Sequence, residues 1–161
     1  MKLCRFGPAG QEKPGLIDAD GNIRDLSSVV PDITPDVLSA EKLRAIAAVD
    51  TGTLPLAGGT PRYGVPVTGT GKFIAIGLNY ADHAAESNLP IPDEPVVFNK
   101  WTNCLQGPND RVVIPKDSKK TDWEVELGVI IGKRANYVDK DEALEHVAGY
   151  CVVNDVSERH W

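Results

Sequence analysis

Two glutamates interrupt an apolar stretch near the middle of the sequence. Glu124 and Glu126 lie within residues 121–132, which otherwise have the composition of a buried strand. Because side chains alternate along a strand, the two carboxylates share one face and lie about 7 Å apart. Such a pair repels away from water, so it needs a cation, a shared proton or open solvent. A half-exposed strand with a solvated acidic face explains the pattern equally well. The opposite face would carry Trp123, Val125, Leu127, Val129 and Ile131.

A histidine and a glutamate form a second candidate pair. Residues 79–87 have helical character and end before Pro90. On a helix, His83 and Glu86 would be three positions apart and could touch. A carboxylate that orients an imidazole and stabilises its protonated form makes a general base. A solvated surface pair is the simpler interpretation of the same spacing.

A third carboxylate, Asp155, ends an apolar segment over residues 150–155. It can be the N-cap of a following helix, with Glu158 three positions later, or a carboxylate at a strand end. Arg159 follows four positions after Asp155, and an ion pair between them is its simplest role. Three carboxylates from two strands would form a hard oxygen site that suits Mg²⁺, Mn²⁺ or Ca²⁺ and leaves positions for water and a chelating substrate.

The elements that would position these residues follow a small N-terminal region. Residues 1–30 contain an Asp-Gly hairpin signal, and a helix is expected from Pro35 to about Asp50. A linker rich in Gly and Pro then leads to a domain boundary near Val67. We therefore expect a small domain and linker over 1–67 and a second domain over 68–161.

Within the second domain, strands are expected at residues 72–77, 95–101 and 111–115. The strand at 72–77 is expected to be central. Lys100 lies near the end of the second of these strands, where a surface lysine is the simplest interpretation. A capping box formed by Asp139 and Glu142 predicts a helix that ends near Gly149.

Composition narrows the classes of function. The 161 residues carry a net charge of −6, which disfavours non-specific nucleic-acid binding. No run of about 18 apolar residues predicts a membrane span. The three cysteines are widely spaced and suit free thiols in a reducing cytoplasm. Residues 157–161 follow an apolar strand without a stop signal, so we expect that the sequence is part of a longer polypeptide.

Three ordered motifs, over residues 77–86, 123–132 and 153–159, together resemble the fumarylacetoacetate hydrolase family. The resemblance covers roughly residues 70–161. Residues 1–7 and 13–16 look like bacterial members labelled ureidoglycolate lyase or 2,4-diketo-3-deoxy sugar-acid hydrolase. The resemblance implies an α+β, mainly β fold. This fold is a mixed β-roll preceded by a small β-rich N-terminal domain, usually in a homodimer. Relatives continue further, so the roll is expected to be incomplete here.

The resemblance also implies roles for individual residues. The metal ligands would be Glu124, Glu126 and Asp155. The catalytic dyad would be His83 with Glu86, carried on a segment that can act as a mobile lid in relatives. Arg159 would lie near the substrate carboxylate or oxo groups, and Lys100 matches a basic strand-end position of some relatives.

The expected activity is divalent-metal-dependent hydrolysis of a carbon–carbon bond in a 2,4-diketo acid, through a metal-stabilised enolate. The cofactor would be Mg²⁺ or Mn²⁺, with Ca²⁺ also suitable. A lyase, decarboxylase or isomerase acting on ureidoglycolate, oxaloacetate or a 2-oxo-enoate is the alternative within the family. A catalytically silent metal-binding or interaction module, or a metal-free domain, belongs to a different class. In the metal-free domain, both glutamates would form a solvated face. The fold alone does not choose among the reactions of the family, because one fold hosts several reactions.

Overall fold

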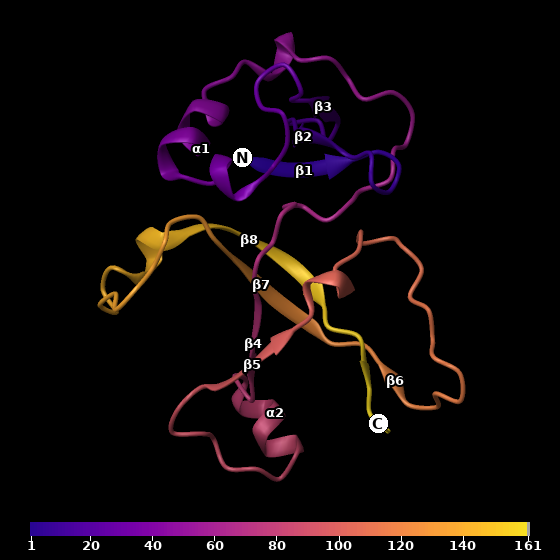
Figure 1. The fold of residues 1–161 in the computed structure, drawn as a ribbon, viewed down its shortest axis with the longest axis vertical. Helices are drawn as coiled ribbons and strands as arrows, with labels where there is room; N and C mark the ends of the chain where they lie inside the picture. The colour runs from indigo at the N-terminus through magenta and orange to yellow at the C-terminus, as the bar shows by residue number, and fades with distance from the viewer. Residues whose placement is uncertain (161) are drawn as a thin grey trace. The chain divides into compact units, whose positions relative to one another are not determined.

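The computed structural model describes residues 1–160, which are mainly β-structure with a few short helices (Figure 1). The described residues form two compact units. One contains Met1–Thr68 together with the residues from Gly107 onward, and the other contains Gly69–Gln106. The domain boundary near Val67 stays a prediction. No helix among the described residues is long and apolar enough to cross a membrane.

The larger unit begins with a three-stranded antiparallel sheet. Its strands are β1 (Lys2–Phe6), β2 (Lys13–Ile17) and β3 (Ile23–Asp25), in that order. The expected hairpin connects β2 to β3. The Asp18 carboxylate closes this turn by accepting hydrogen bonds from the backbone N–H groups of Asp20 and Asn22, at 3.0 and 2.9 Å. Gly21 supplies the positive φ of +85° that the turn requires.

Short helices cover this sheet. They are η1 (Pro35–Val37), α1 (Ala40–Ala47) and η2 (Thr51–Thr53). The single helix expected from Pro35 is therefore divided, because Ser39 caps a new helix by accepting a hydrogen bond from the Lys42 backbone N–H. The buried core of this region consists of Cys4, Phe6, Leu16, Ile23, Leu26, Ile33, Val37, Leu38, Ile46 and Leu54.

The same unit continues with two antiparallel strand pairs. One pair is β7 (Val125–Ile131) with β8 (Val147–Asn154), which run side by side in Figure 1. The other pair is β6 (Thr121–Asp122) with β9 (Ser157–Glu158). Ile130 of β7 and Ala148 of β8 pack against the buried cluster of Ile33, Val37 and Leu38, which ties the pair to the N-terminal region.

Two local expectations in this part of the chain are wrong, and one of the two alternatives for Asp155 is excluded. The helix predicted to end near Gly149 is only the short turn η4 (Ala143–His146), because the chain pairs with β7 from Val147 onward. Of the two interpretations of Asp155, the structure has the strand end: β8 ends at Asn154, the Asp155 backbone N–H donates to the carbonyl of Glu124, and β9 follows in place of a helix. Within the described residues, 111–115 form no strand.

The face of β7 that was expected to be buried is the exposed one. Alternation is present as predicted, but the apolar side chains of Val125, Leu127, Val129 and Ile131 are exposed. The face that carries Glu126 is the partly buried one. The expectation that residues 121–132 and 150–155 form buried strands is therefore wrong for one face of each strand.

The smaller unit contains β4 (Phe73–Gly77), α2 (Ala81–Glu86), β5 (Val96–Lys100) and η3 (Thr102–Cys104). β4 and β5 pair antiparallel, with Phe73 opposite Lys100 and Gly77 opposite Val96. The strand predicted at 72–77 is present, but it is not central, because its described sheet has only these two strands. Ala84 of α2 is the buried contact of the helix.

Candidate active site

The two glutamates lie at the start of β7 and on the same side of it. Glu124 immediately precedes the strand and Glu126 is its second residue, opposite Val153 of β8. Both are partly buried, and 21% of the Glu124 side chain is exposed. The carboxylates therefore occupy the less exposed side of the strand pair, where charge–charge interactions are screened less than in open solvent.

Backbone hydrogen bonds bring Asp155 beside this pair. The Asp155 N–H donates to the Glu124 carbonyl at 2.8 Å. The Glu124 N–H donates in turn to the side-chain oxygen of Asn154 at 3.1 Å. The end of β8 is thus fastened to the start of β7, so the backbone positions of Glu124 and Asp155 are adjacent, as the sequence motifs require.

Arg159 contacts this acidic group. Its guanidinium lies 2.7 Å from the Glu124 carboxylate and 3.1 Å from that of Asp122. Arg159 thus forms ion pairs with Asp122 and Glu124, and the expected pair with Asp155 stays a prediction. A cation of the chain itself therefore balances part of the negative charge of Glu124 and Asp122.

Sequence reasoning missed Asp122, and it considered Glu158 only as a capping partner of Asp155. Asp122 lies two positions before Glu124, so extending the alternation by one step would have found it. Glu158 accepts hydrogen bonds from the Ser118 and Thr121 hydroxyls and from the backbone N–H of Lys120. The bond from Ser118, followed by the backbone bonds, holds the pKa of Glu158 below its ordinary value. No local pattern predicts this loop contact.

The donor chemistry suits a hard divalent ion, because Glu124, Glu126 and Asp155 offer only carboxylate oxygens. Across residues 1–160, however, no group of three or more His, Cys, Asp or Glu side chains is arranged to hold a metal ion. The residue types thus suit a hard divalent ion, and a backbone hydrogen bond brings Asp155 beside Glu124, but the side chains are not arranged as a metal site. The ligand set stays a prediction.

The predicted dyad lies on α2 of the smaller unit. Its six residues place His83 and Glu86 one turn apart, with His83 half-buried and Glu86 exposed. The backbone N–H of His83 donates to the Asp82 carboxylate at 2.9 Å, and its carbonyl accepts from Ser87 at 3.0 Å. The helix expected around these residues is present, and their catalytic role stays a prediction.

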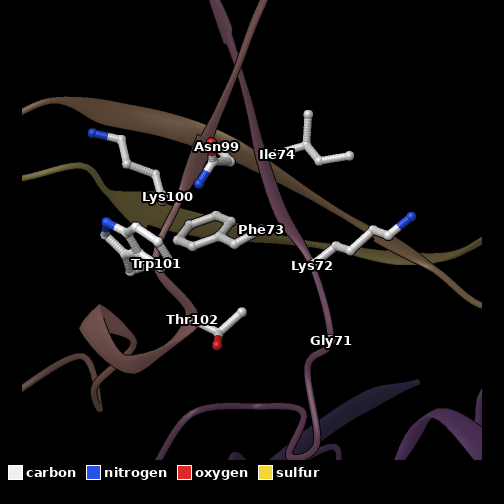
Figure 2. Close-up of a pocket in the computed structure, with 8 residues that line it drawn as sticks. All are labelled: Gly71, Lys72, Phe73, Ile74, Asn99, Lys100, Trp101 and Thr102. Atoms are coloured by element: carbon white, nitrogen blue, oxygen red, sulfur yellow. The ribbon is translucent and has the colours of Figure 1, made fainter.

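Lys100 borders an open pocket in the smaller unit (Figure 2). Its ammonium nitrogen lies 5.6 Å from the centre of the Phe98 ring, within the range of a cation–π contact. Figure 2 shows the Lys100 side chain with those of Phe73 and Trp101, which line the same pocket. The pocket has a volume of about 360 Å³ and is lined by Gly71, Lys72, Phe73, Ile74, Asn99, Lys100, Trp101 and Thr102.

Comparisons with known proteins place the chain among related enzymes. Residues 72–161 match the family profile described as fumarylacetoacetate (FAA) hydrolase, C-terminal. A Burkholderia ambifaria protein provisionally named a hydrolase is 64% identical over all 161 residues. The chain spans 57% of that relative's length.

Solved structures of other proteins share this fold, among them two hydrolases. One is a fumarylacetoacetate hydrolase from Exiguobacterium antarcticum, with 31% identity and a TM-score of 0.79 over 99% of this chain and 57% of that one. The other is maleylpyruvate hydrolase from Sphingobium sp. SYK-6, in complex with manganese(II) and pyruvate. It has 26% identity and a TM-score of 0.79 over 100% of this chain and 60% of that one.

Proposed function

The chain belongs to the fumarylacetoacetate hydrolase family, as its motifs predict, and we propose that it is part of a divalent-metal-dependent hydrolase that cleaves a carbon–carbon bond in a 2,4-diketo acid. The observation that carries this proposal is the family match over residues 72–161, which contains every candidate site residue. The Sphingobium relative, which acts on maleylpyruvate and binds manganese(II) and pyruvate, supports both the metal and a pyruvate-type product.

In this proposal Glu124, Glu126 and Asp155 hold Mg²⁺ or Mn²⁺, with Ca²⁺ as a further option. The bound ion supplies Lewis-acid stabilisation of negative charge on the substrate's 2-oxo oxygen. Arg159 leaves its ion pair with Glu124 and binds the substrate carboxylate. Lys100 adds a second positive charge for the anionic substrate. The metal and Arg159 assignments are supported by the carboxylate-rich start of β7 and by the Arg159 contact with it. The Lys100 assignment is supported by the family resemblance.

His83 acts as the general base, and Glu86 orients its imidazole. His83 removes a proton from water, and the resulting hydroxide attacks the carbonyl carbon distal to the carboxylate. The bond between that carbonyl carbon and the carbon that joins it to the 2-oxo group then breaks. This cleavage yields a carboxylic acid and the enolate of pyruvate or a pyruvate analogue. Protonation of the enolate carbon completes the hydrolysis. The reaction consumes one water molecule.

The test uses this sequence joined to the remaining part of the Burkholderia ambifaria relative, in the order found in that relative; we refer to this protein as the joined chain. Turnover is measured on acylpyruvates, oxaloacetate and ureidoglycolate, with and without Mg²⁺ or Mn²⁺. We expect metal-dependent release of pyruvate from acylpyruvates. Turnover of oxaloacetate or ureidoglycolate alone would instead assign a decarboxylase or lyase. No turnover of any substrate would favour a silent module.

We also propose that the whole protein is a homodimer. The family resemblance supports this assignment. Sedimentation equilibrium of the joined chain tests it directly, because a dimer has twice the mass of the chain. A single species of monomer mass at micromolar concentration would contradict it.

A further inference from the structure

The Arg159 guanidinium contacts Asp122 through more than one of its nitrogens. Its Nε donates a hydrogen bond to the Asp122 Oδ2 at 3.1 Å, and its Nη2 lies 3.1 Å from the same oxygen. The contact with Glu124 is made by Nη2, at 2.7 Å. If Glu124 were taken by another cation, the Nε hydrogen bond to Asp122 would therefore still be in place.

The backbone of Arg159 is fixed to the segment that carries Asp122. β6 and β9 pair antiparallel, with Asp122 opposite Ser157. The Arg159 N–H donates to the carbonyl of Lys120 at 2.9 Å, which extends this pairing by one step. The arginine and the aspartate therefore start from adjacent segments of one strand pair.

Further hydrogen bonds order this strand pair and the aspartate. The Glu158 carboxylate accepts from the hydroxyls of Ser118 and Thr121, which fastens the loop before β6 to β9. The Asp122 Oδ1 accepts from the Trp123 backbone N–H at 2.9 Å. An exposed ion pair usually gains little, because two flexible side chains must be ordered to form it. Here the aspartate is already ordered, so less entropy is lost when it holds the guanidinium.

We propose that Asp122 is a positioning residue that keeps the Arg159 guanidinium beside Glu124 when a cation occupies Glu124, so that Arg159 can bind the substrate carboxylate. This inference rests on the proposed function, in which a divalent ion takes Glu124. Within residues 1–160 the Arg159 Nη1 donates no hydrogen bond, and 44% of the side chain is exposed, so an anion can reach this nitrogen. Without Asp122, the long side chain released from Glu124 would regain its rotamer freedom.

A structural ion pair that only joins β6 to β9 is the alternative role for Asp122. Its loss would lower stability and would weaken anion binding, if at all, whether or not Arg159 were present. A positioning residue acts through the arginine, so its loss should have no further effect once the arginine is removed. A double-mutant cycle separates these two roles.

The first experiment measures exchange of the Arg159 Nε–H with water by ¹⁵N NMR in the joined chain, without metal. Glu124→Gln removes the charge that a bound cation would neutralise. We expect similar exchange rates in the wild type and Glu124→Gln, and exchange about three- to fivefold faster in Asp122→Asn. The Nε–H of Arg44, exposed on α1, is the internal control and should exchange equally in all three proteins.

Two outcomes of this experiment would overturn the proposal. An unchanged Arg159 rate in Asp122→Asn would show that the aspartate does not hold the guanidinium. Exchange in Glu124→Gln as fast as in Asp122→Asn would show that the hold depends on Glu124, so that it would be lost when a cation binds there.

The second experiment measures the Kd of pyruvate, the product type expected under the proposed function, by isothermal titration at saturating Mg²⁺. Asp122→Asn should raise this Kd about three- to fivefold, and Asp122→Glu should restore part of the loss. In an Arg159→Gln background, Asp122→Asn should have no further effect. Asp141→Asn, at an exposed position before η4, is the matched control and should keep the wild-type Kd. The same rise with and without Arg159 would assign Asp122 a structural role and overturn the proposal.

The two experiments distinguish a failure of this inference from a failure of the proposed function. The exchange rate requires neither metal nor turnover. If the wild-type joined chain bound no pyruvate, the hydrolase proposal would fail, while an exchange rate that depends on Asp122 would still show that this residue holds Arg159. Wild-type affinity for pyruvate in Asp122→Asn would leave the hydrolase proposal standing and overturn the role of Asp122.

Discussion

Arg159 and a divalent ion would compete for the same carboxylate. The guanidinium contacts Glu124 at 2.7 Å, and 44% of the Arg159 side chain is exposed. An ion pair this exposed is worth only about 0.2–1 kcal/mol, because solvent screens it. A metal ion can therefore displace the arginine at little cost, after which the guanidinium is free to bind an anionic substrate. In the proposed mechanism Arg159 thus pairs with Glu124 in the metal-free site and binds the substrate in the metal-bound site.

Replacing Arg159 by Gln should strengthen metal binding. Removing the competing cation frees the Glu124 carboxylate, so the Kd of the joined chain for Mn²⁺ should fall about two- to fivefold. Isothermal titration with MnCl₂ measures this change without any substrate. Arg44→Gln, at an exposed position on α1, is the matched control. Weaker binding by Arg159→Gln would show that the arginine supports the metal site instead of competing with it.

Glu126→Gln tests the ligand assignment itself. A metal that binds only the folded protein must raise the melting midpoint, by an amount set by its concentration relative to Kd. We expect millimolar Mn²⁺ to raise the midpoint of the joined chain and the Glu126→Gln variant to lose most of this rise. Glu145→Gln, an exposed glutamate in η4, should retain the rise. Full retention of the rise and of turnover by Glu126→Gln would rule out Glu126 as a ligand.

At the scale of elements, the attachment of β7 to the N-terminal region depends on a glycine. The backbone N–H of Gly132 donates to the His146 carbonyl at 2.9 Å, immediately after β7 ends. A Cβ at this position would meet the Leu38 backbone oxygen and would lie 2.6 Å from the Ala148 Cβ. Only glycine therefore lets the strand pair approach the cluster that contains Leu38.

Gly132→Ala should destabilise the 161-residue chain by about 1–3 kcal/mol, since the overlap with backbone atoms can be relieved only by moving a strand. Gly149→Ala is the matched control, because nothing lies within 4 Å of its added Cβ. Urea unfolding followed by circular dichroism gives both free energies. Equal midpoints for the two variants would show that β7 shifts freely, which would contradict the packing described for Ile130 and Ala148.

At the scale of the whole larger unit, a network of ion pairs connects distant parts of the chain. Arg62 contacts Glu12 at 2.8 Å and Asp110 at 2.5 Å, which joins the N-terminal sheet to the loop that begins at Gly107. Arg5 is buried and pairs with Asp32 at 2.7 Å. The hydrogen bonds from Arg62 hold the pKa values of Glu12 and Asp110 below their ordinary values of 4.5 and 3.8.

These lowered pKa values predict a loss of stability in acid. A carboxyl group whose pKa is lower in the folded state binds fewer protons there than in the unfolded chain. Its contribution is therefore complete above the unfolded pKa and is lost as the pH falls through the folded pKa. We expect the urea midpoint to fall as the pH is lowered below about 4.5, the ordinary value for Glu12.

Arg62→Met should make this acid dependence shallower, because it removes the cause of the lowered pKa of both Glu12 and Asp110. Urea midpoints measured between neutral pH and strongly acidic pH provide the comparison. Arg44→Met, an exposed substitution of the same type, should keep the wild-type dependence. An identical pH profile for Arg62→Met would mean that other carboxylates control acid unfolding.

The amino-acid sequence by itself determined the family, the positions of the main strands and the alternation that places Glu124 and Glu126 on one side of β7. These features are local, since motif order, strand period and turn residues depend on neighbouring positions. Only the tertiary structure decided which side of β7 is covered, that Arg159 contacts Asp122 and Glu124, and that Arg62 reaches Asp110. Such contacts join residues far apart in the sequence, and their choice depends on the packing of whole elements. For the same reason the helix predicted before Gly149 gave way to β8, because pairing with β7 outweighed a local capping signal.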